Sequence, residues 1–102
     1  MNLFDTGWVV GILEGEGSFT QKMPTHYPIV SMGITDQDIA ERLASLIGAR
    51  VYGPYISKLG HKSTFQVVLQ GKEAATVMKL VSPHMGQRRQ ARIKEILNCQ
   101  SP

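Results

Sequence analysis

The chain has 102 residues, a formal net charge of +3, and 42% hydrophobic and 19% charged residues. This length predicts one domain spanning residues 1–102 with a modest core. No apolar run reaches the roughly 18 residues of a membrane helix, and no basic secretion signal opens the chain. We therefore expect an intracellular protein without a membrane partner, in the cytoplasm, an organelle matrix or a phage-infected cell. The single cysteine, Cys99, excludes an internal disulfide, and no Cys/His spacing suggests zinc.

The first expected element is a helix from about Gly7 to Glu14. Asp5 or Thr6 is its expected N-cap, and Gly15 and Gly17 are its expected stop. The apolar residues of this segment recur at helical spacing: Trp8, Val9, Ile12 and Leu13.

Glycine recurs at positions 7, 11 and 15, so all three fall near one face of this helix. Each costs about 1 kcal/mol of helix stability relative to alanine, but allows another backbone to approach closely. Two explanations stay open at this point. The glycines pack against the chain's own second helix, or the helix packs on its copy in a second subunit across a two-fold axis. The second explanation predicts a dimer interface of Gly7, Trp8, Gly11, Ile12 and Gly15.

Beyond Gly17 the hydrophobic period changes to two. A strand from Ser18 to Met23, the turn "PTHYP" and a strand carrying Val30, Met32 and Ile34 predict a first hairpin. "TDQDIAERLASLIG" predicts a helix that Thr35 or Asp36 caps and Gly48 closes. "ARVYGPYI" and "STFQVVLQG" predict a second hairpin around the polar loop "SKLGHK". "KEAATVMKLV" predicts a third helix, and "QRRQARIKEIL" a basic fourth helix beyond Pro83.

This order predicts an α+β fold in which two hairpins form a four-stranded antiparallel sheet. Helices cover the apolar face of the sheet and leave the polar face open. No acidic residue occurs between Gly17 and Thr35 or between Arg42 and Lys72, the two stretches that hold the strands. The open face is either an ordinary solvated surface or a nucleic-acid interface, because a curved antiparallel ribbon fits a major groove. Its candidate contacts are Ser18, Thr20, Lys22, Ser31, Thr35, Arg50, Tyr52, Lys62, Thr64 and Gln66.

Two acids, Glu14 and Glu16, follow the apolar helix at an end where the helix dipole does not favour negative charge. They are either solvated surface charges or members of a site. If the helix pairs with its copy, two such acids approach each other, and a divalent cation offsets their repulsion. The basic residues of the last helix allow the same two interpretations, a solvated face or a contact with phosphate: Arg88, Arg89, Arg92 and Lys94.

The stretch "VVGILEGEG", residues 9–17, resembles the nine-residue motif of the LAGLIDADG homing endonucleases. Gly11 falls on the first motif glycine, Glu16 on the final acid and Gly17 on the closing glycine. The order of elements also resembles the αββαββα core of that family, here with an extra C-terminal helix. With one motif in the chain, the resemblance implies a homodimer that binds and cuts a long, roughly palindromic double-stranded DNA site.

The resemblance also implies the roles of individual residues. Glu16, next to Gly15, would lie at a metal site for Mg²⁺, with Mn²⁺ as a substitute. Arg88 or Arg89 would be the supporting basic residue, and Gln66 or Gln87 a group that positions water. The alternatives are a catalytically degenerate DNA- or RNA-binding protein, such as a regulator or splicing cofactor, and a homodimer without any nucleic-acid role.

Overall fold

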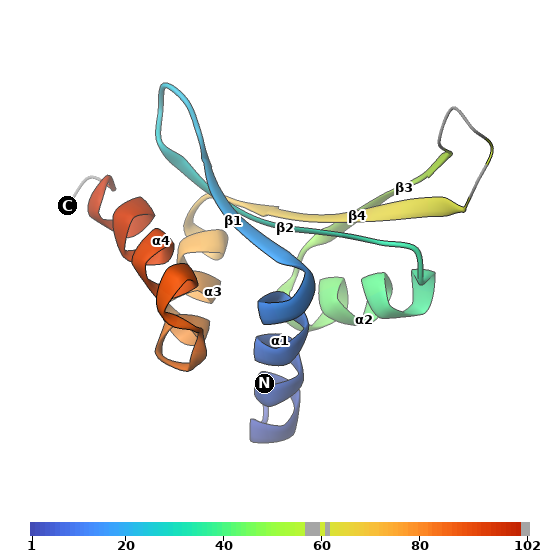
Figure 1. Ribbon diagram of the computed structural model, residues 1–102, viewed down its shortest axis with the longest axis horizontal. Helices are drawn as coiled ribbons and strands as arrows, with labels where there is room; N and C mark the ends of the chain where they lie inside the picture. Colours follow the sequence, from blue (N-terminus) through green and yellow to red (C-terminus); the bar gives the residue numbers. More distant parts are fainter. Residues whose placement is uncertain (57–59, 61, 101–102) are drawn as a thin grey trace.

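The computed structural model describes residues 1–56, 60 and 62–100. These residues form four α-helices and one short 3₁₀ helix, which lie on one side of a four-stranded sheet (Figure 1). In chain order the elements are α1 Leu3–Glu16, β1 Gly17–Lys22, β2 Tyr27–Ile34, α2 Gln37–Ile47, β3 Arg50–Ile56, β4 Ser63–Gln70, α3 Lys72–Val81, η1 Ser82–His84 and α4 Gln87–Asn98.

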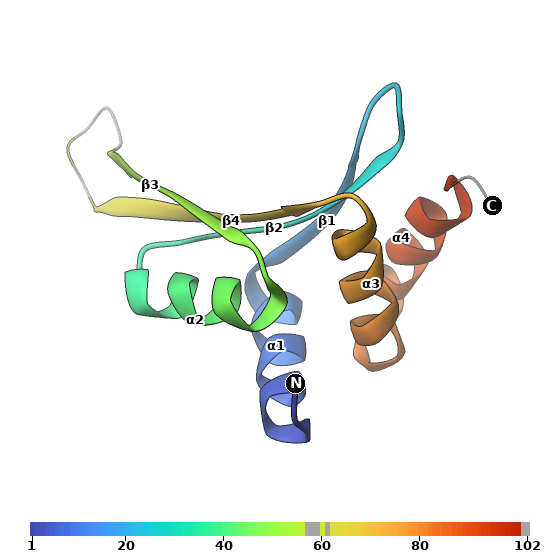
Figure 2. The same ribbon diagram turned by 180° about the vertical axis from the view of Figure 1, so that it is seen from behind.

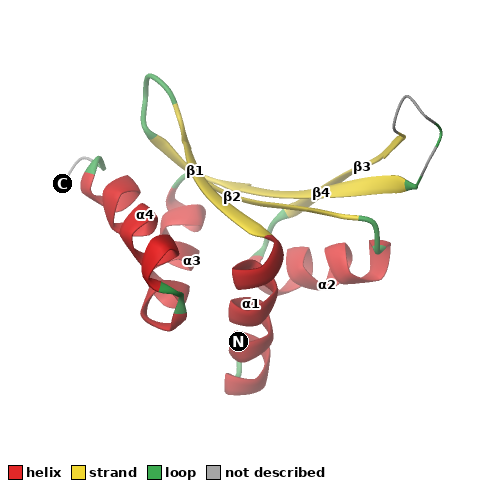
Figure 3. Cartoon of the chain, viewed as in Figure 1, coloured by secondary structure: helices red, strands yellow, loops and turns green. Residues whose placement is uncertain are grey.

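The four strands form one antiparallel sheet in the order β1-β2-β4-β3. Each hairpin therefore supplies one edge strand and one central strand. Figure 3 shows all the helices on one side of the curved sheet, while the β1–β2 turn rises on the other side. This arrangement is the one expected for strands that alternate between apolar and polar residues.

The core lies between the sheet and the helices. The side chains of Met32, Leu43, Met78 and Ile93 are almost completely buried and come from β2, α2, α3 and α4. The inner face of β4 carries Val67 and Leu69, which are buried, and Phe65, which packs against the core.

Helix α1 is longer than predicted and starts earlier. Its N-cap is Asn2, whose Oδ1 accepts a hydrogen bond of 2.8 Å from the backbone N–H of Asp5. The prediction of Asp5 or Thr6 as the cap was wrong, since both lie inside the first turn. Gly15 does not stop the helix, which runs on through Glu16. α1 then leads directly into β1 at Gly17, where φ is −83° rather than left-handed.

The first hairpin also differs in detail. Tyr27 and Pro28 belong to β2 rather than to the turn, because Tyr27 pairs with Lys22 and Pro28 with Gln21. Met23 lies beyond β1 and is 61% exposed. In the loop "SKLGHK", residues 57–59 and 61 lie outside the described residues.

The remaining helices agree with the sequence patterns. Asp36 is the N-cap of α2, although its side chain makes no capping hydrogen bond, and Gly48 ends α2 with φ of 74°. That left-handed conformation is one that glycine adopts without strain. Pro83 lies in the 3₁₀ turn that separates α3 from α4. Seen from behind, α3 and α4 lie side by side under the first hairpin (Figure 2). Within the described part of the chain, no helix is long and apolar enough to cross a membrane.

Candidate functional site

The open face of the sheet carries the predicted contact residues in rows. Ser18 of β1 lies opposite Ser31 of β2, and Arg50 of β3 lies opposite Val68 of β4, with Ser31 and Val68 paired between them. Residues directly opposite each other share a face of the sheet. The row Ser18–Ser31–Val68–Arg50 therefore crosses all four strands on the side away from the helices.

A second row joins Gly33, Gln66 and Tyr52, and a third joins Thr20, Ile29 and Gln70. Tyr27 lies opposite Lys22 at the end of the first hairpin. Sequence reasoning missed Tyr27 and Gln70, although strict alternation from Ser31 and Gln66 would have placed both on this face. Thr35 is exposed and lies one residue beyond the end of β2, where it lines a hollow together with Gly33 and Gln66 of the open face. Lys62 is exposed just before β4.

The register of the β3–β4 hairpin shifts between Tyr52 and Tyr55. Tyr52 pairs with Gln66, and Tyr55 pairs with Thr64, so both tyrosines share a face although they are three residues apart. Their exposed fractions are 42% and 51%. The irregularity, which contains Gly53 with φ of 121°, thus adds a second aromatic side chain to the open face.

Glu16 lies at the sheet end of α1, where the helix passes into β1, and its side chain is exposed. It lines a hollow of about 530 Å³ together with Gly33, Thr64 and Gln66. The amide of Gln66 lies across Gly33, whose missing side chain makes room for it: a Cβ there would be 2.7 Å from Gln66 Nε2. The structure thus brings together two predicted catalytic residues, Glu16 and Gln66.

The same hollow contains Asp36, an acid that sequence reasoning used only as a helix cap. The Asp36 side chain makes no capping hydrogen bond, so its carboxylate is not used to cap α2. In the sequence, Asp36 stands in the stretch "TDQD", and an acid at this place is explained as well by the start of a helix as by a functional site.

The arginines of α4 lie in a different place. Arg88, Arg89 and Arg92 line a second hollow of about 250 Å³ along the outer edge of β1, with Ser18 and Thr20. No lining residue is shared with the hollow that contains Glu16. The structure therefore does not bring the predicted basic residues into the hollow that holds Glu16 and Gln66.

Two of these arginines are engaged with the chain itself. Arg89 donates a hydrogen bond of 2.7 Å to the carbonyl of Gly17, and its Nε lies 3.5 Å from Glu14 Oε2. Arg92 donates to the carbonyl of Phe19 and pairs with Glu95. Glu14 is thus an ion-pair partner, whereas Glu16 has no ion pair among the described residues.

The glycine face of α1 is uncovered. A Cβ placed at Gly7, Gly11 or Gly15 would meet no atom of the described residues within 4 Å. The explanation that these glycines pack against the chain's own second helix is therefore wrong. Contact with α2 uses Trp8 instead, since the Arg42 guanidinium lies 4.0 Å from the centroid of the Trp8 ring.

Exposed apolar side chains extend this glycine face. Leu3 is 92% and Phe4 77% exposed, at the end of α1 farthest from the sheet (Figure 1). Trp8 and Ile12, which we predicted at the interface, are half-buried against the core and flank the glycines. Sequence reasoning missed Leu3 and Phe4 because it began the helix too late.

The described residues do not form a complete site for a metal ion. No group of three or more His, Cys, Asp or Glu side chains that could hold a metal ion occurs among the described residues. The exposed carboxylate of Glu16, which has no ion pair among the described residues, is a suitable oxygen ligand for a divalent cation.

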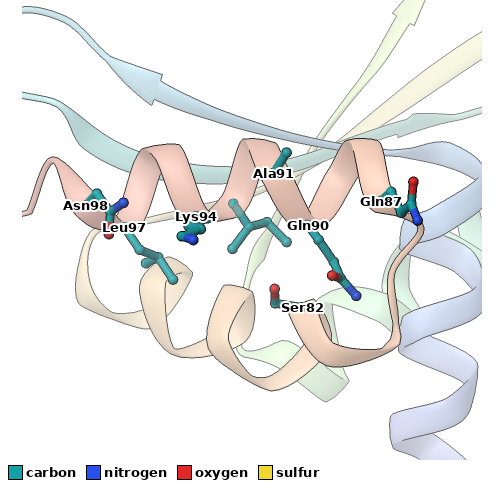
Figure 4. A pocket seen from close by; sticks show the side chains of 8 residues that line it. Ser82, Gln87, Gln90, Ala91, Lys94, Leu97 and Asn98 are labelled. Atoms are coloured by element: carbon teal, nitrogen blue, oxygen red, sulfur yellow. The ribbon is translucent and has the colours of Figure 1, made fainter.

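Another hollow, of about 520 Å³, lies between η1 and α4 (Figure 4). Ser82, Gln90 and Leu97 are among its lining residues, together with two residues of α4 that the sequence analysis had considered, Gln87 and Lys94. It is separate from the open face of the sheet.

No family model matches the sequence, and no curated protein matches it. Solved structures do match. The homing endonuclease I-CvuI in complex with its target superposes with a TM-score of 0.70 at 15% identity, over 95% of this chain and 68% of that chain. The archaeal intron-encoded homing endonuclease I-Vdi141I, complexed with DNA, gives a TM-score of 0.66 at 21% identity, over 93% of this chain and 67% of that chain.

At these identities the likeness establishes the architecture rather than the chemistry. The α+β fold that the motif and the element order predicted is confirmed. This chain has the fold of the LAGLIDADG homing endonucleases.

Proposed function

We propose that this protein is a site-specific double-strand DNA endonuclease that acts as a homodimer and hydrolyses phosphodiesters with a divalent metal ion. The observation that carries the proposal is the position of Glu16. Its carboxylate, which has no ion pair among the described residues, ends a helix whose glycine face they leave uncovered, next to a sheet whose strands contain no acid.

The exposed face of α1 supports the proposed dimer. Backbones that carry glycine at every fourth residue can approach each other closely, and the exposed Leu3 and Phe4 add apolar surface to the same contact. A two-fold axis along this face brings together the same surface from both copies. It also brings the two Glu16 carboxylates toward each other, which one chain alone cannot do.

DNA is the partner that fits the open face. The strands contribute hydroxyl, amide, tyrosine and basic side chains, with Lys22 and Arg50 near opposite edges of the sheet. Such groups bind phosphates and read base edges in the major groove. The matching solved structures include I-CvuI with DNA that is not cleaved in the presence of Mg.

The chemistry belongs to Glu16 and its neighbours. The Glu16 carboxylates, with the adjoining backbone at Gly15, would hold Mg²⁺, for which Mn²⁺ can substitute. When bound, the metal supplies a Lewis acid that lowers the pKa of water and stabilises the leaving oxygen. The Gln66 amide, in the same hollow as Glu16, can orient a water molecule by donating and accepting hydrogen bonds. Arg88 is exposed at the edge of β1 and offers charge to a backbone phosphate.

The test is the variant Glu16→Gln, which keeps the size of the side chain and removes its charge. We expect cleavage of a target selected from a random DNA library to fall by at least about a hundredfold, while DNA affinity changes little. Glu41→Gln is the matched control, because Glu41 is an exposed acid on α2. Cleavage at the wild-type rate by Glu16→Gln would remove Glu16 from the metal site.

Two other outcomes separate the alternatives. A wild-type protein that binds DNA with steep salt dependence but cuts no selected target in Mg²⁺ or Mn²⁺ would be a degenerate nucleic-acid-binding protein. A protein without salt-dependent DNA affinity would be a homodimer without a nucleic-acid role.

A further inference from the structure

Arg89 is the most constrained of the α4 arginines in the second hollow. Its side chain is 18% exposed, its guanidinium donates to the Gly17 carbonyl at 2.7 Å, and Nε lies 3.5 Å from Glu14. The guanidinium carbon also lies 5.9 Å from the centroid of the Phe19 ring. One side chain of α4 therefore touches the last turn of α1 and the first residues of β1.

Glu14 also lies close to the N-terminus of α4. Its Oε1 would lie 2.9 Å from a Cβ at Gly86, the N-cap residue of α4. A carboxylate beside the N-terminus of a helix is favoured by the helix dipole. The acid that is poorly placed for its own helix is thus well placed for another helix.

Arg92 offers an internal comparison. It lies one turn further along α4 and donates to the Phe19 carbonyl, so it also binds the edge of β1. Its carboxylate partner, Glu95, belongs to α4 itself. Arg92 therefore joins α4 to β1, and among the described residues it has no hydrogen bond or ion pair with α1.

We propose that Arg89 is a positioning residue: with Glu14 it clamps the junction between α1 and β1 and so fixes where Glu16 lies. This inference rests on the proposed function, because the importance of the position of Glu16 depends on its role there. Glu16 stands between the two clamped groups, two residues after Glu14 and one residue before Gly17. Rotation of the last turn of α1 would move Glu16 and break both contacts of Arg89.

This assignment separates two neighbouring arginines that the sequence could not tell apart. A guanidinium that already binds a carboxylate and a carbonyl has fewer donors left for a phosphate. Arg88 is exposed, so the direct contact with phosphate falls to it.

The test measures the junction itself, by hydrogen exchange of single amides in the intact protein. The probe is the Gly17 amide, which donates to the Leu13 carbonyl at the end of α1. We expect Arg89→Gln and Glu14→Gln each to raise the exchange rate of this amide at least about tenfold, because either change removes a charge-assisted contact from the clamp. The double variant should exchange no faster than the faster single variant, since the two residues act as one unit.

Arg92→Gln is the matched control, and we expect it to leave the Gly17 amide within about twofold of the wild-type rate. An equal increase in Arg92→Gln would mean that α4 merely stabilises the whole chain, and it would overturn the inference. An unchanged Gly17 rate in both Arg89→Gln and Glu14→Gln would overturn it as well. The use of two variants keeps the test decisive if one of them fails to fold.

Cleavage assays then connect the clamp to Glu16. In Arg89→Gln we expect the Mg²⁺ concentration for half-maximal cleavage to rise at least about fivefold, with DNA affinity nearly unchanged. A wild-type protein that does not cut would refute the proposed function and leave the exchange result standing. A wild-type protein that cuts, together with an unchanged Gly17 rate in both variants, would refute only the clamp.

Discussion

Helices α1 and α2 both pack on the sheet, yet they use their surfaces differently. α2 turns Ala40, Leu43 and Ala44 inward and exposes polar residues, as an ordinary surface helix does. α1 buries Val9 and Leu13 but also exposes Leu3 and Phe4 beside a row of glycines. This exposed apolar surface supports the homodimer that we propose.

A substitution on the inner face of α1 should cause the largest loss of stability. Leu13 is completely buried, so Leu13→Ala removes its buried methyl groups and leaves a cavity. We expect the free energy of unfolding in urea to fall by about 2–5 kcal/mol. Leu80→Ala is the control, because Leu80 is 42% exposed, and it should cost much less. Similar losses in both variants would mean that α1 is not anchored through this face.

A substitution on the outer, glycine-bearing face of α1 should instead weaken the proposed dimer. Gly11→Leu places a large side chain where one chain has open space, so the monomer fold should persist. In a close contact between helices the same side chain clashes, and we expect the dimer dissociation constant to rise at least about tenfold. Sedimentation equilibrium measures this change, with Ser45→Leu on exposed α2 surface as the control. An unchanged dimer in Gly11→Leu would exclude this face from the contact.

The same contrast explains how much of the fold the sequence could predict. The order of the elements, the paired hairpins and the inward residues of β4 follow from hydrophobic periods and turn residues, which are local signals. The start of α1 was missed because Leu3 and Phe4 are not buried, and Asn2 caps the helix before the apolar period begins. The register shift that brings Tyr55 beside Tyr52 depends on pairing with β4, which strict alternation along β3 cannot show.

The candidate site also contains some features that the sequence could predict and others that it could not. Glu16 was identifiable because the chain around it matches a motif, and Gln66 lies in its hollow because strand register places it there. The separate functions that we assign to Arg88 and Arg89 depend on side-chain direction. Neighbouring residues on a helix differ by about 100° around its axis, but nothing local shows which of them faces α1. The contact between Glu14 and Arg89 joins residues 75 positions apart in the sequence, which no spacing rule captures.

The smallest effects should come from the glycines at the ends of the two helices, and they should have opposite signs. Gly48 ends α2 with φ of 74°, so Gly48→Ala strains the backbone, and we expect it to destabilise the chain by about 1 kcal/mol. Gly15 is helical and a Cβ there meets nothing within 4 Å, so Gly15→Ala should stabilise the isolated chain by up to about 1 kcal/mol.

Urea unfolding at concentrations below the dimer dissociation constant tests both values, because no second chain then covers the glycine face. The stabilising effect of Gly15→Ala should shrink or reverse as the protein concentration rises and the two helices meet, whereas the cost of Gly48→Ala should not depend on concentration. If Gly15→Ala destabilises the dilute protein as much as Gly48→Ala does, the glycine at position 15 serves the single chain. The difference between α1 and α2 would then lie in their packing within one chain rather than in their partners.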